Sequence, residues 1–520
     1  MTHYKKRIAV CAWIVMGSLS GFSQTSLQER SLSAAELQED FEILQSVLNN
    51  YHPGLYRYQD STSIANHFTV LHNKLNTNRS TTEFYLMLSK FSARLACGHT
   101  YCNFYNQNQN IQDSIFNLPN KVPFTFQLLD KRMMLDKNLS DQDIKAGSEI
   151  IAINDIPVSV IIDSLLLYIK GDGSNNGKRL NDLALSGLGK FEAFDIFFPL
   201  LFPPQNSSYT LTIIPYRAEY IRHRSAWGKA QDNSKRYGDT GHEQRQFFPV
   251  QCVSRAERLK RIEQKYGKQK NAYDDLWNFK IMKENTAYLQ LGTFVTNQLT
   301  IDWKKWLANA FDAVSAKDIS NLIIDLRGNE GGNDEVNLEL AKYLASKQIT
   351  FPKFQELLVY EKVADDLIPY LKTWDDGFYD RRGKLTDLNN GFYTWKKDRK
   401  SKVIRKRKQA FLGELYLLVD AANSSATFFL ATGLRQNGLA TIIGEETGGN
   451  RKGTNGGQLF FLTLPNSQIE IDIPLIGYFP LTEQPDAGLM PDIVVLPTFG
   501  DMRRHKDVVL AKTLELIDQK

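Results

Sequence analysis

The sequence has few cysteines and lacks several motifs that identify common enzyme classes. Four cysteines occur in 520 residues, and neither CxxC nor HExxH is present, so no pattern supports zinc chemistry. The GxSxG elbow that an α/β-hydrolase esterase requires is absent, and so is the GK[ST] ending of a phosphate loop. We therefore expect no metal and no cofactor.

Neither positive nor negative charge dominates the chain. It has 63 basic and 58 acidic residues, for a formal net charge of +5, so nothing indicates a nucleic-acid partner. The densest basic stretch, residues 396–408, lacks interleaved aromatic residues and predicts a solvated loop. Hydrophobic residues make up 42%, which is typical of a globular protein with a packed core.

The first residues have the order of a secretory signal peptide. Basic residues at 5–7 precede an apolar run over residues 8–16, and small and polar residues continue to Gln24. The run is shorter than the roughly 20 residues that span a bilayer. We predict that residues 1–24 are a signal peptide and that the mature protein is periplasmic or extracellular, without stable membrane insertion. Cys11 lies near the start of the apolar run, which argues against its lipid modification.

Three cysteines remain after the predicted cleavage: Cys97, Cys102 and Cys252. Export to an oxidising compartment permits a disulfide between Cys97 and Cys102. Cys252 would then be left unpaired.

Changes of periodicity along the chain predict several folded units in a mixed α/β multidomain protein. Residues 25–115 carry apolar residues at helical spacing and predict a helical N-terminal domain. Residues 116–218 consist of short strand-like runs around one amphipathic helix and predict a β-rich domain. Residues 219–280 are polar and weakly periodic, which predicts an insertion or linker.

Within the β-rich part, the segment IKAGSEIIAINDIPV, residues 144–158, resembles a PDZ domain. A glycine turn leads into an apolar strand, and an Asn-Asp turn then leads into a helix. PDZ domains bind extended peptides by adding a strand to a sheet edge. The resemblance therefore implies a PDZ-like domain that binds peptide, and the alternative is a small β-rich domain without a ligand.

Residues 281–500 predict an α/β core, followed by a C-terminal helix over residues 501–520. Apolar runs typical of buried parallel strands alternate with amphipathic helices. The predicted strands cover residues 287–294, 321–326, 414–420 and 440–445.

Two turns that follow predicted strands could support chemistry. The segment DLRGNEGGN, residues 325–333, places closely spaced glycines after a strand, where backbone N–H groups can hold a developing oxyanion. Ser424 and Ser425 lie in the turn after the next strand, at the start of a helix whose N-terminus carries partial positive charge. The alternative for residues 325–333 is an ordinary tight turn, and the alternative for Ser424 and Ser425 is that they only cap the helix.

Two further segments complete an ordered set. The glycine-rich loop GEETGGNRKG, residues 444–453, follows a third strand, and GLMPDIVV, residues 488–495, follows later. The order DLRGNEGG, NSSA, GEETGG and GLMPD resembles the S41 peptidase family, of the C-terminal-processing and tricorn-core type. The resemblance covers about residues 287–497. It implies a ClpP/crotonase-like peptidase core and a serine endopeptidase or C-terminal processing peptidase that cleaves extended peptides or unfolded proteins.

The resemblance also assigns roles to individual residues. Ser425 stands at the position of the family's nucleophile, and Ser424 is the less favoured neighbour. The N–H groups of Ala426 and of Gly331 or Gly332 would form the oxyanion hole.

One departure from the family pattern keeps a second function open. The family usually has an acidic residue three positions after the nucleophile, where this chain has Phe428. The alternative is therefore a catalytically inactive peptide-binding protein of the same fold.

The family has two solutions for the general base. Lys452 lies in the loop where one branch has its lysine, but two positions later, whereas His99 in CGHTYC stands where the tricorn-like branch has its histidine. We favour His99 because imidazole titrates near neutrality, while a lysine must first be desolvated. With His99 as base, kcat/KM should rise through a pKa of about 6–7. Glu483 is the predicted acid that orients the histidine, and Asp486 competes with it.

Overall fold

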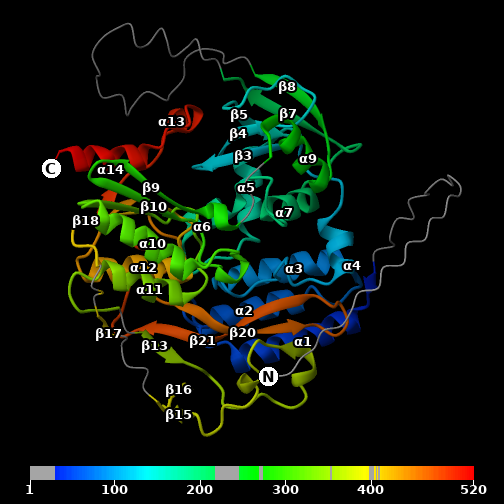
Figure 1. Ribbon diagram of the computed structural model, residues 1–520. Coiled ribbons are helices and arrows are strands. Elements are labelled where there is room, and N and C mark those ends of the chain that lie inside the picture. The colour runs from blue at the N-terminus through cyan, green and yellow to red at the C-terminus, as the bar shows by residue number, and fades with distance from the viewer. Residues whose placement is uncertain are drawn as a thin grey trace, which may run out of the picture.

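A computed structural model describes residues 30–216, 245–268, 273–351, 354–397, 403–405, 407 and 410–519 (Figure 1). The predicted signal peptide lies outside the described residues. In the described part, no helix is both long and apolar enough to cross a membrane.

The N-terminal part is helical, as predicted. Its helices α1 and α3 each begin with a capping box, formed by Ser33 with Glu36 and by Ser80 with Glu83, and such a cap contributes about 1 kcal/mol. Its elements are β1 (Ser31–Leu32), α1 (Ala34–Tyr51), α2 (Ser61–His72), β2 (Arg79–Ser80), α3 (Thr81–Arg94), α4 (Gln109–Ile111) and a π-helical turn (Gln112–Phe116).

The next part is built on an antiparallel sheet of order β3-β4-β5-β7-β8, with β6 paired to β5. The four strands predicted between residues 116 and 218, and the helix among them, are present. The elements are β3 (Phe124–Leu129), β4 (Arg132–Asn138), β5 (Glu149–Ile153), β6 (Ile156–Pro157), α5 (Val158–Leu166), α6 (Asn176–Leu183), α7 (Ala193–Leu201) and β7 (Ser208–Ile214).

Residues 219–280 were predicted to be an insertion or linker, but their described portion includes regular secondary structure that packs on the β-rich part. Residues 246–251 form β8 (Gln246–Gln251), which pairs with β7, and they are followed by α9 (Arg255–Tyr266). On α9, Arg258 is fully buried and bonds to Asp195 of α7. This buried ion pair therefore anchors α9 to the β-rich part.

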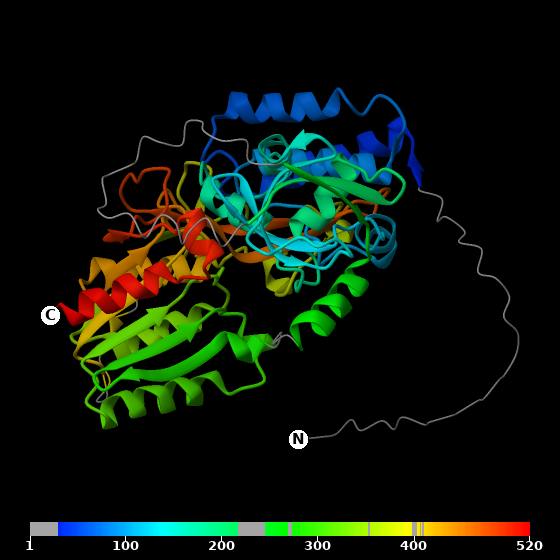
Figure 2. The same ribbon diagram turned by 90° about the horizontal axis from the view of Figure 1, so that it is seen from above.

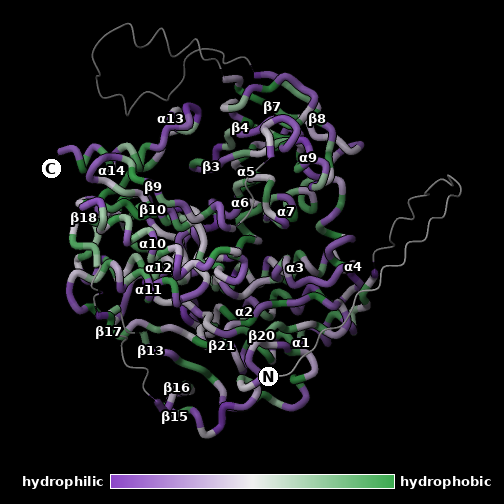
Figure 3. The backbone as a smooth tube through the Cα atoms, in the orientation of Figure 1, coloured by the Kyte–Doolittle hydropathy of each residue, from purple (hydrophilic) through white to green (hydrophobic). Residues whose placement is uncertain are grey.

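The α/β core contains a sheet of order β22-β19-β18-β11-β10-β9, parallel except for β9. Helix α14 covers one face, while α10, α11 and α12 cover the other (Figures 1 and 2). The central strands β11 and β18 are almost entirely buried, as expected for a sheet covered on both faces, and hydrophobic and hydrophilic stretches alternate along the tube in Figure 3. The elements are β9 (Trp277–Lys283), β10 (Thr286–Leu291), α10 (Trp303–Ala316), β11 (Asn321–Asp325), α11 (Asp334–Leu344), β18 (Glu414–Val419), α12 (Ser425–Gln436), β19 (Thr441–Gly444), β22 (Ile493–Val494), α13 (Phe499–Arg503) and α14 (Val508–Asp518).

A second sheet of the C-terminal half packs on the N-terminal helices. Its order is β13-β21-β20-β14, and β21 runs beside α1 (Figure 1). The Asp40 carboxylate on α1 accepts the N–H of Ser467 at 2.8 Å, so two ends of the chain share one core. The strands are β13 (Phe354–Leu357), β14 (Leu371–Lys372), β20 (Thr454–Thr463) and β21 (Glu470–Pro480), and two small pairs join β12 (Ile349–Thr350) to β17 (Val403–Ile404) and β15 (Leu385–Asp387) to β16 (Tyr393–Trp395).

The disulfide that export would permit between Cys97 and Cys102 is not formed in the structure, where both residues are free thiols, as is Cys252. Cys97 Sγ accepts a hydrogen bond from the Asn455 side chain at 3.4 Å. The Cys102 thiol instead lies near serine hydroxyls of α3. The two buried sulfur atoms therefore face different neighbours.

The predicted basic loop is ordered where it is described. Its Arg407 forms an ion pair with Glu339 of α11, and Val403–Ile404 form β17. Residues 398–402, 406, 408 and 409 lie outside the described residues.

Candidate active site

Three loops meet at the carboxyl edge of the core sheet. They follow β11, β18 and β19, which are adjacent and parallel, so their C-terminal ends lie at one edge, where α/β proteins usually place their sites. The glycine-rich turn after β11, the serine turn after β18 and the glycine-rich loop after β19 are thus brought together.

Asn423 ties the serine turn to the glycine-rich turn. Its side-chain amide donates to the carbonyl oxygens of Leu326 at 2.5 Å and Asn329 at 3.0 Å. Its Oδ1 accepts the N–H of Asp420 at 2.8 Å. Because Asn423 is fully buried, these bonds fix the position of the two turns relative to each other.

Ser425 occupies a strained backbone conformation at the first position of α12. Its φ is +50°, a region that side-chain-bearing residues adopt at a cost of about 1–3 kcal/mol and that is enriched at active sites. The Ser424 hydroxyl donates to the carbonyl of Glu330 at 3.0 Å and makes no cap bond to the helix. In the described structure, the half-buried Ser425 hydroxyl has no hydrogen-bond partner, so neither serine side chain caps α12.

The glycine-rich turn presses against Ser425. A Cβ placed on Gly331 would lie 2.9 Å from both the Ser425 Cβ and the Ala426 nitrogen. The Gly331 N–H donates to Asn329 Oδ1 at 2.9 Å in this conformation, which favours Gly332, the other predicted donor. The N–H groups of Gly332 and Ala426 remain as candidates, since Ala426 lies in the first helical turn, where N–H groups lack intrahelical partners.

His99 lies in the turn that follows α3, and buried side chains hold that turn. The His52 Nε2 lies 2.9 Å from the Thr100 hydroxyl, and His52 Nδ1 accepts the N–H of Gly54. Asp172 Oδ1 accepts the N–H of Gly98 at 2.8 Å. The residues on both sides of His99 are therefore anchored.

The His99 ring lies against β20, where a Cβ on Gly456 would be 3.6 Å from Nε2. Its Nδ1 is buried without a hydrogen-bond partner among the described residues. Burial lowers the pKa of His99, Asp172 partly opposes this, and two nearby lysines, Lys170 and Lys178, lower the pKa further. The ring is therefore neutral near pH 7, as a general base must be.

An ion-pair network connects the surroundings of His99 to the serine turn. Lys178 Nζ lies 2.5 Å from Asp182 Oδ1 and 3.2 Å from Glu330 Oε1, and the Glu330 carbonyl accepts the Ser424 hydroxyl. The described residues show no direct hydrogen bond between His99 and Ser425. The joint action of His99 and Ser425 therefore stays a prediction.

Residues 285–495 match the family model "Peptidase family S41". They include the glycine-rich turn after β11, the serine turn after β18 and the glycine-rich loop after β19. This part of the chain is an S41 peptidase domain. The match covers the core sheet except β9, and the strands β20 and β21, but not the segment that carries His99. The histidine therefore comes from outside the matched region.

Solved structures of CPAF share the fold of this chain over almost its whole length, and two further structures align with lower scores. Mature CPAF complexed with lactacystin is 15% identical, and the alignment covers 94% of this chain and 98% of that chain with a TM-score of 0.59. The photosystem II D1 C-terminal processing protease is 14% identical over 92% of this chain and 99% of that chain, with a TM-score of 0.38. Tricorn protease is 11% identical over 93% of this chain and 36% of that chain, with a TM-score of 0.35.

At this low identity the similarity to CPAF shows a shared fold of mixed α/β multidomain type and nothing about activity. No curated protein sequence matches the chain.

Lys452 lies at the edge of the S41 site. Its N–H donates to Asn450 Oδ1 at 2.9 Å, and its carbonyl accepts from the Arg57 guanidinium at 3.0 Å. Its half-buried side chain places Nζ 6.0 Å from the ring centre of Tyr58. The structure therefore directs this lysine toward Tyr58, and its assignment as a base stays a prediction.

The two candidate acids differ in their surroundings. Glu483 is exposed, and the described structure gives its carboxylate no hydrogen bond or ion pair. Asp486 Oδ1 accepts from the Asn450 side chain at 2.6 Å and from the N–H of Ser174 at 3.1 Å. Neither contacts His99, so the orienting role of Glu483 also stays a prediction.

Asp172 is the residue that the sequence analysis missed. It is 5% exposed, and besides the N–H of Gly98 it accepts the Thr454 hydroxyl at 3.1 Å. It lies in GDGSNNG, a segment with no S41 signature, and only its contacts reveal its place beside His99. Its negative charge raises the pKa of His99 and so favours the protonated form of the ring.

Phe428, which stands where the family usually has an acid, is buried among apolar residues. A Cβ on Gly449 would lie 2.3 Å from its ring, so the aromatic side chain fits only because residue 449 is glycine. Among the described residues, no group of three His, Cys, Asp or Glu side chains is arranged to hold a metal ion.

Proposed function

We propose that this S41 protein is an exported serine peptidase that cleaves extended polypeptides, as an endopeptidase or as a C-terminal processing peptidase. The observation that carries the proposal is the Ser425 hydroxyl, which is unpaired in the described structure and lies at the N-terminus of α12 with a backbone φ of +50°. This geometry presents a nucleophile beside two N–H groups, as acyl transfer requires.

In the proposed mechanism, Ser425 Oγ attacks the scissile carbonyl while His99 accepts its proton. The N–H groups of Ala426 and Gly332 stabilise the negative charge on the carbonyl oxygen. His99 then donates the proton to the leaving amine, and a water molecule activated by the same ring hydrolyses the acyl-enzyme. Catalytic hydrogen bonds often tighten only when substrate binds, and we propose that His99 and Ser425 meet in that state.

Asp172 would support this chemistry as a positioning residue. Its carboxylate holds the turn that carries His99 and favours the imidazolium that forms during the reaction. Glu483 would add an orienting contact only if its loop moved toward the histidine.

We also propose that the β-rich part acts as a PDZ-like domain that presents peptide to the core, which would be of the ClpP/crotonase-like type. Support comes from the sheet of order β3-β4-β5-β7-β8 with α5 beside it, since a strand can be added at a sheet edge.

A non-catalytic peptide-binding protein is the second candidate. Two observations favour it: the apolar Phe428 in the usual acidic position and the absence of a hydrogen bond between Ser425 and His99 in the described structure. Substrate binding would then not be followed by cleavage.

Internally quenched peptides and unfolded proteins test the two candidates. We expect cleavage by the mature protein, loss of at least about 10³-fold in kcat/KM in Ser425→Ala, and activity within a few-fold of wild type in Ser424→Ala. Equal turnover by wild type and Ser425→Ala, with peptide affinity retained, would favour the binding protein.

Export is a separate proposal that rests on residues 1–24. Expression of the full chain in a bacterium with a general secretion pathway, followed by mass analysis of the purified product, should yield a mature chain that begins near residue 25. A cytoplasmic product that retains residue 1 would contradict export.

A further inference from the structure

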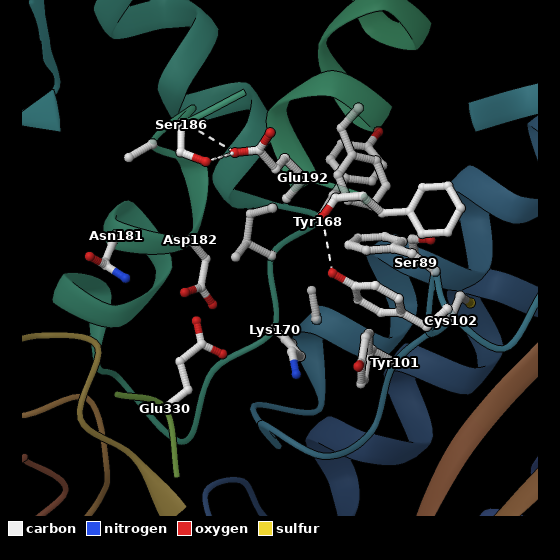
Figure 4. Close-up of a pocket in the computed structure, with 18 of the residues that line it drawn as sticks. Ser89, Tyr101, Cys102, Tyr168, Lys170, Asn181, Asp182, Ser186, Glu192 and Glu330 are labelled. Atoms are coloured by element: carbon white, nitrogen blue, oxygen red, sulfur yellow. Dashed lines mark hydrogen bonds between the residues drawn. The ribbon is translucent and has the colours of Figure 1, made fainter. Parts of the chain in front are cut away.

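A cavity of about 510 Å³ lies between the helical N-terminal part and the β-rich part (Figure 4). Side chains from α3, from the segment after His99 and from α6 and α7 line it. Its size falls in the range of about 300–1,000 Å³ that is typical of ligand pockets.

The cavity lies next to the glycine-rich turn that contacts Ser425 and next to the turn that carries His99. Gly328 and Glu330 line one end, and Gly331, the next residue, contacts Ser425 and Ala426. Tyr101 lines it two positions after His99. A peptide bound at Ser425 can therefore direct a neighbouring side chain into the cavity.

Aromatic rings form one wall of the cavity. Phe104 and Tyr168 both pack on Phe197, with ring centres 5.8 and 5.4 Å apart, and Tyr105 packs edge-on against Phe191 at 5.5 Å. Tyr105 is 55% exposed although it is a large aromatic residue. Such a surface favours another aromatic ring, because rings pack well edge-to-face and offset.

Most charged groups of the cavity are paired with one another. In Figure 4 the carboxylates of Asp182 and Glu330 point toward each other, and Lys178 bridges them. Glu192 receives bonds from Ser186 and lies near the guanidinium of Arg258. The Lys170 ammonium lies 3.8 Å from the centre of the Tyr101 ring. A basic substrate side chain would lose hydration here without gaining a free partner, and an acidic one would have to compete with the Tyr101 ring for Lys170.

We propose that this cavity is the specificity pocket of the peptidase and takes a bulky aromatic side chain of the substrate, close to the scissile bond. The inference rests on the proposed function and names the substrate class of that site: extended peptides with Phe, Tyr or Trp beside the cleaved bond. The aromatic wall supplies the attraction, and the balanced charges disfavour acidic and basic side chains.

Two variants probe the pocket without touching the catalytic groups. Tyr105→Ala removes an exposed ring from the wall, and Asn181→Trp introduces a large side chain at an exposed position of the lining to fill the space. Trp374→Ala is the control, because Trp374 is 69% exposed and packs on Phe461 instead of lining the cavity.

The measurement is the cleavage-site profile of a mixed peptide library, read by mass spectrometry, together with kcat/KM for quenched peptides that carry Phe, Gly, Lys or Glu at one position. We expect the Phe peptide to be preferred by about 10-fold or more, and this preference to shrink several-fold in Tyr105→Ala and in Asn181→Trp but not in Trp374→Ala. Binding of the Phe and Gly peptides to Ser425→Ala, measured by fluorescence anisotropy, should show the same order.

Labelling of Ser425 by a fluorophosphonate distinguishes a failure of the pocket assignment from a failure of the proposed peptidase function. A protein that is labelled and cleaves peptides without aromatic preference, or whose preference is unchanged in both pocket variants, would overturn the pocket assignment alone. A preference for acidic residues, created by Lys170, would also overturn it. A folded protein that is neither labelled nor active, yet binds the Phe peptide more tightly than the Gly peptide, would overturn the proposed peptidase function while supporting the pocket.

Discussion

Gly331 packs so closely against Ser425 that a methyl group on the glycine would lie 2.9 Å from the serine Cβ. Gly331→Ala must therefore displace Ser425 or the Ala426 N–H, which lies equally close. We expect kcat/KM to fall by about 10²–10³-fold, as when one oxyanion-hole donor is removed, and steady-state kinetics on a quenched peptide would measure it.

Gly383→Ala is the matched control for this variant. Gly383 also has a positive φ, +77°, but a methyl group added to it would meet no atom within 4 Å, so the two substitutions share the backbone strain and differ in the clash. We expect Gly383→Ala to keep full activity and to lose about 1–2 kcal/mol of stability. Equal activities of the two variants would show that the contact between Gly331 and Ser425 does not matter.

The pH profile tests the electrostatic role of Asp172. Burial lowers the pKa of His99 and Asp172 raises it in part, so the acid limb of kcat/KM should lie below the ordinary histidine value of 6.5. Asp172→Asn removes the charge that favours imidazolium, so the His99 pKa falls further and the limb moves to lower pH.

Asp163→Asn serves as the control for the pH experiment, because Asp163 forms an exposed ion pair with Lys131 and is not among the charged groups that act on His99. Its acid limb should match that of wild type. If the limb of Asp172→Asn also stays in place while its activity drops, Asp172 is a structural residue only.

The choice between the two predicted bases can be made by substitution. His99→Gln should reduce kcat/KM by about 10²–10⁴-fold, the usual contribution of a general base. Lys452→Met should retain activity within a few-fold, because its backbone holds the loop through Arg57 and Asn450 while its side chain lies over Tyr58. The reverse ranking, with a profile still rising above about pH 9, would assign the base to Lys452.

Asn423 should prove essential to the fold of the site. Asn423→Ala leaves the carbonyls of Leu326 and Asn329 and the N–H of Asp420 without their partner, so we expect a loss of roughly 2–5 kcal/mol in urea unfolding. Asn437→Ala, at the far end of α12, removes bonds to Thr350 and Gly433 at the surface and should cost about 1 kcal/mol or less. Similar losses in the two variants would contradict the role of Asn423.

The elements with strong local periodicity were predictable from the sequence. The helices of residues 34–94, the strands of the β-rich part and the strands around β11 and β18 all appear where apolar spacing places them. The order of the glycine-rich and serine turns along the chain also predicted the family correctly. These turns meet in space because they follow adjacent parallel strands, whose C-terminal ends lie at one edge of the sheet.

The remaining features depend on contacts between distant residues. The sheet of β20 and β21 packs on α1 through hydrogen bonds such as that between Asp40 and Ser467. No local sequence pattern predicts this packing of a C-terminal sheet on an N-terminal helix. Residues 255–266 fell within the polar segment predicted as an insertion or linker, although the charge of Arg258 is buried against Asp195. Asp172 lies in a polar loop, and only the fold brings it to the turn that carries His99.

The most direct test of the account is labelling of the mature protein with a serine-directed fluorophosphonate, with the adduct mapped by mass spectrometry. We predict an adduct on Ser425 that is absent in Ser425→Ala, strongly reduced in His99→Gln and retained in Lys452→Met. No adduct on Ser425 in a folded protein that binds peptides would contradict the assignment of this S41 member as an active serine peptidase.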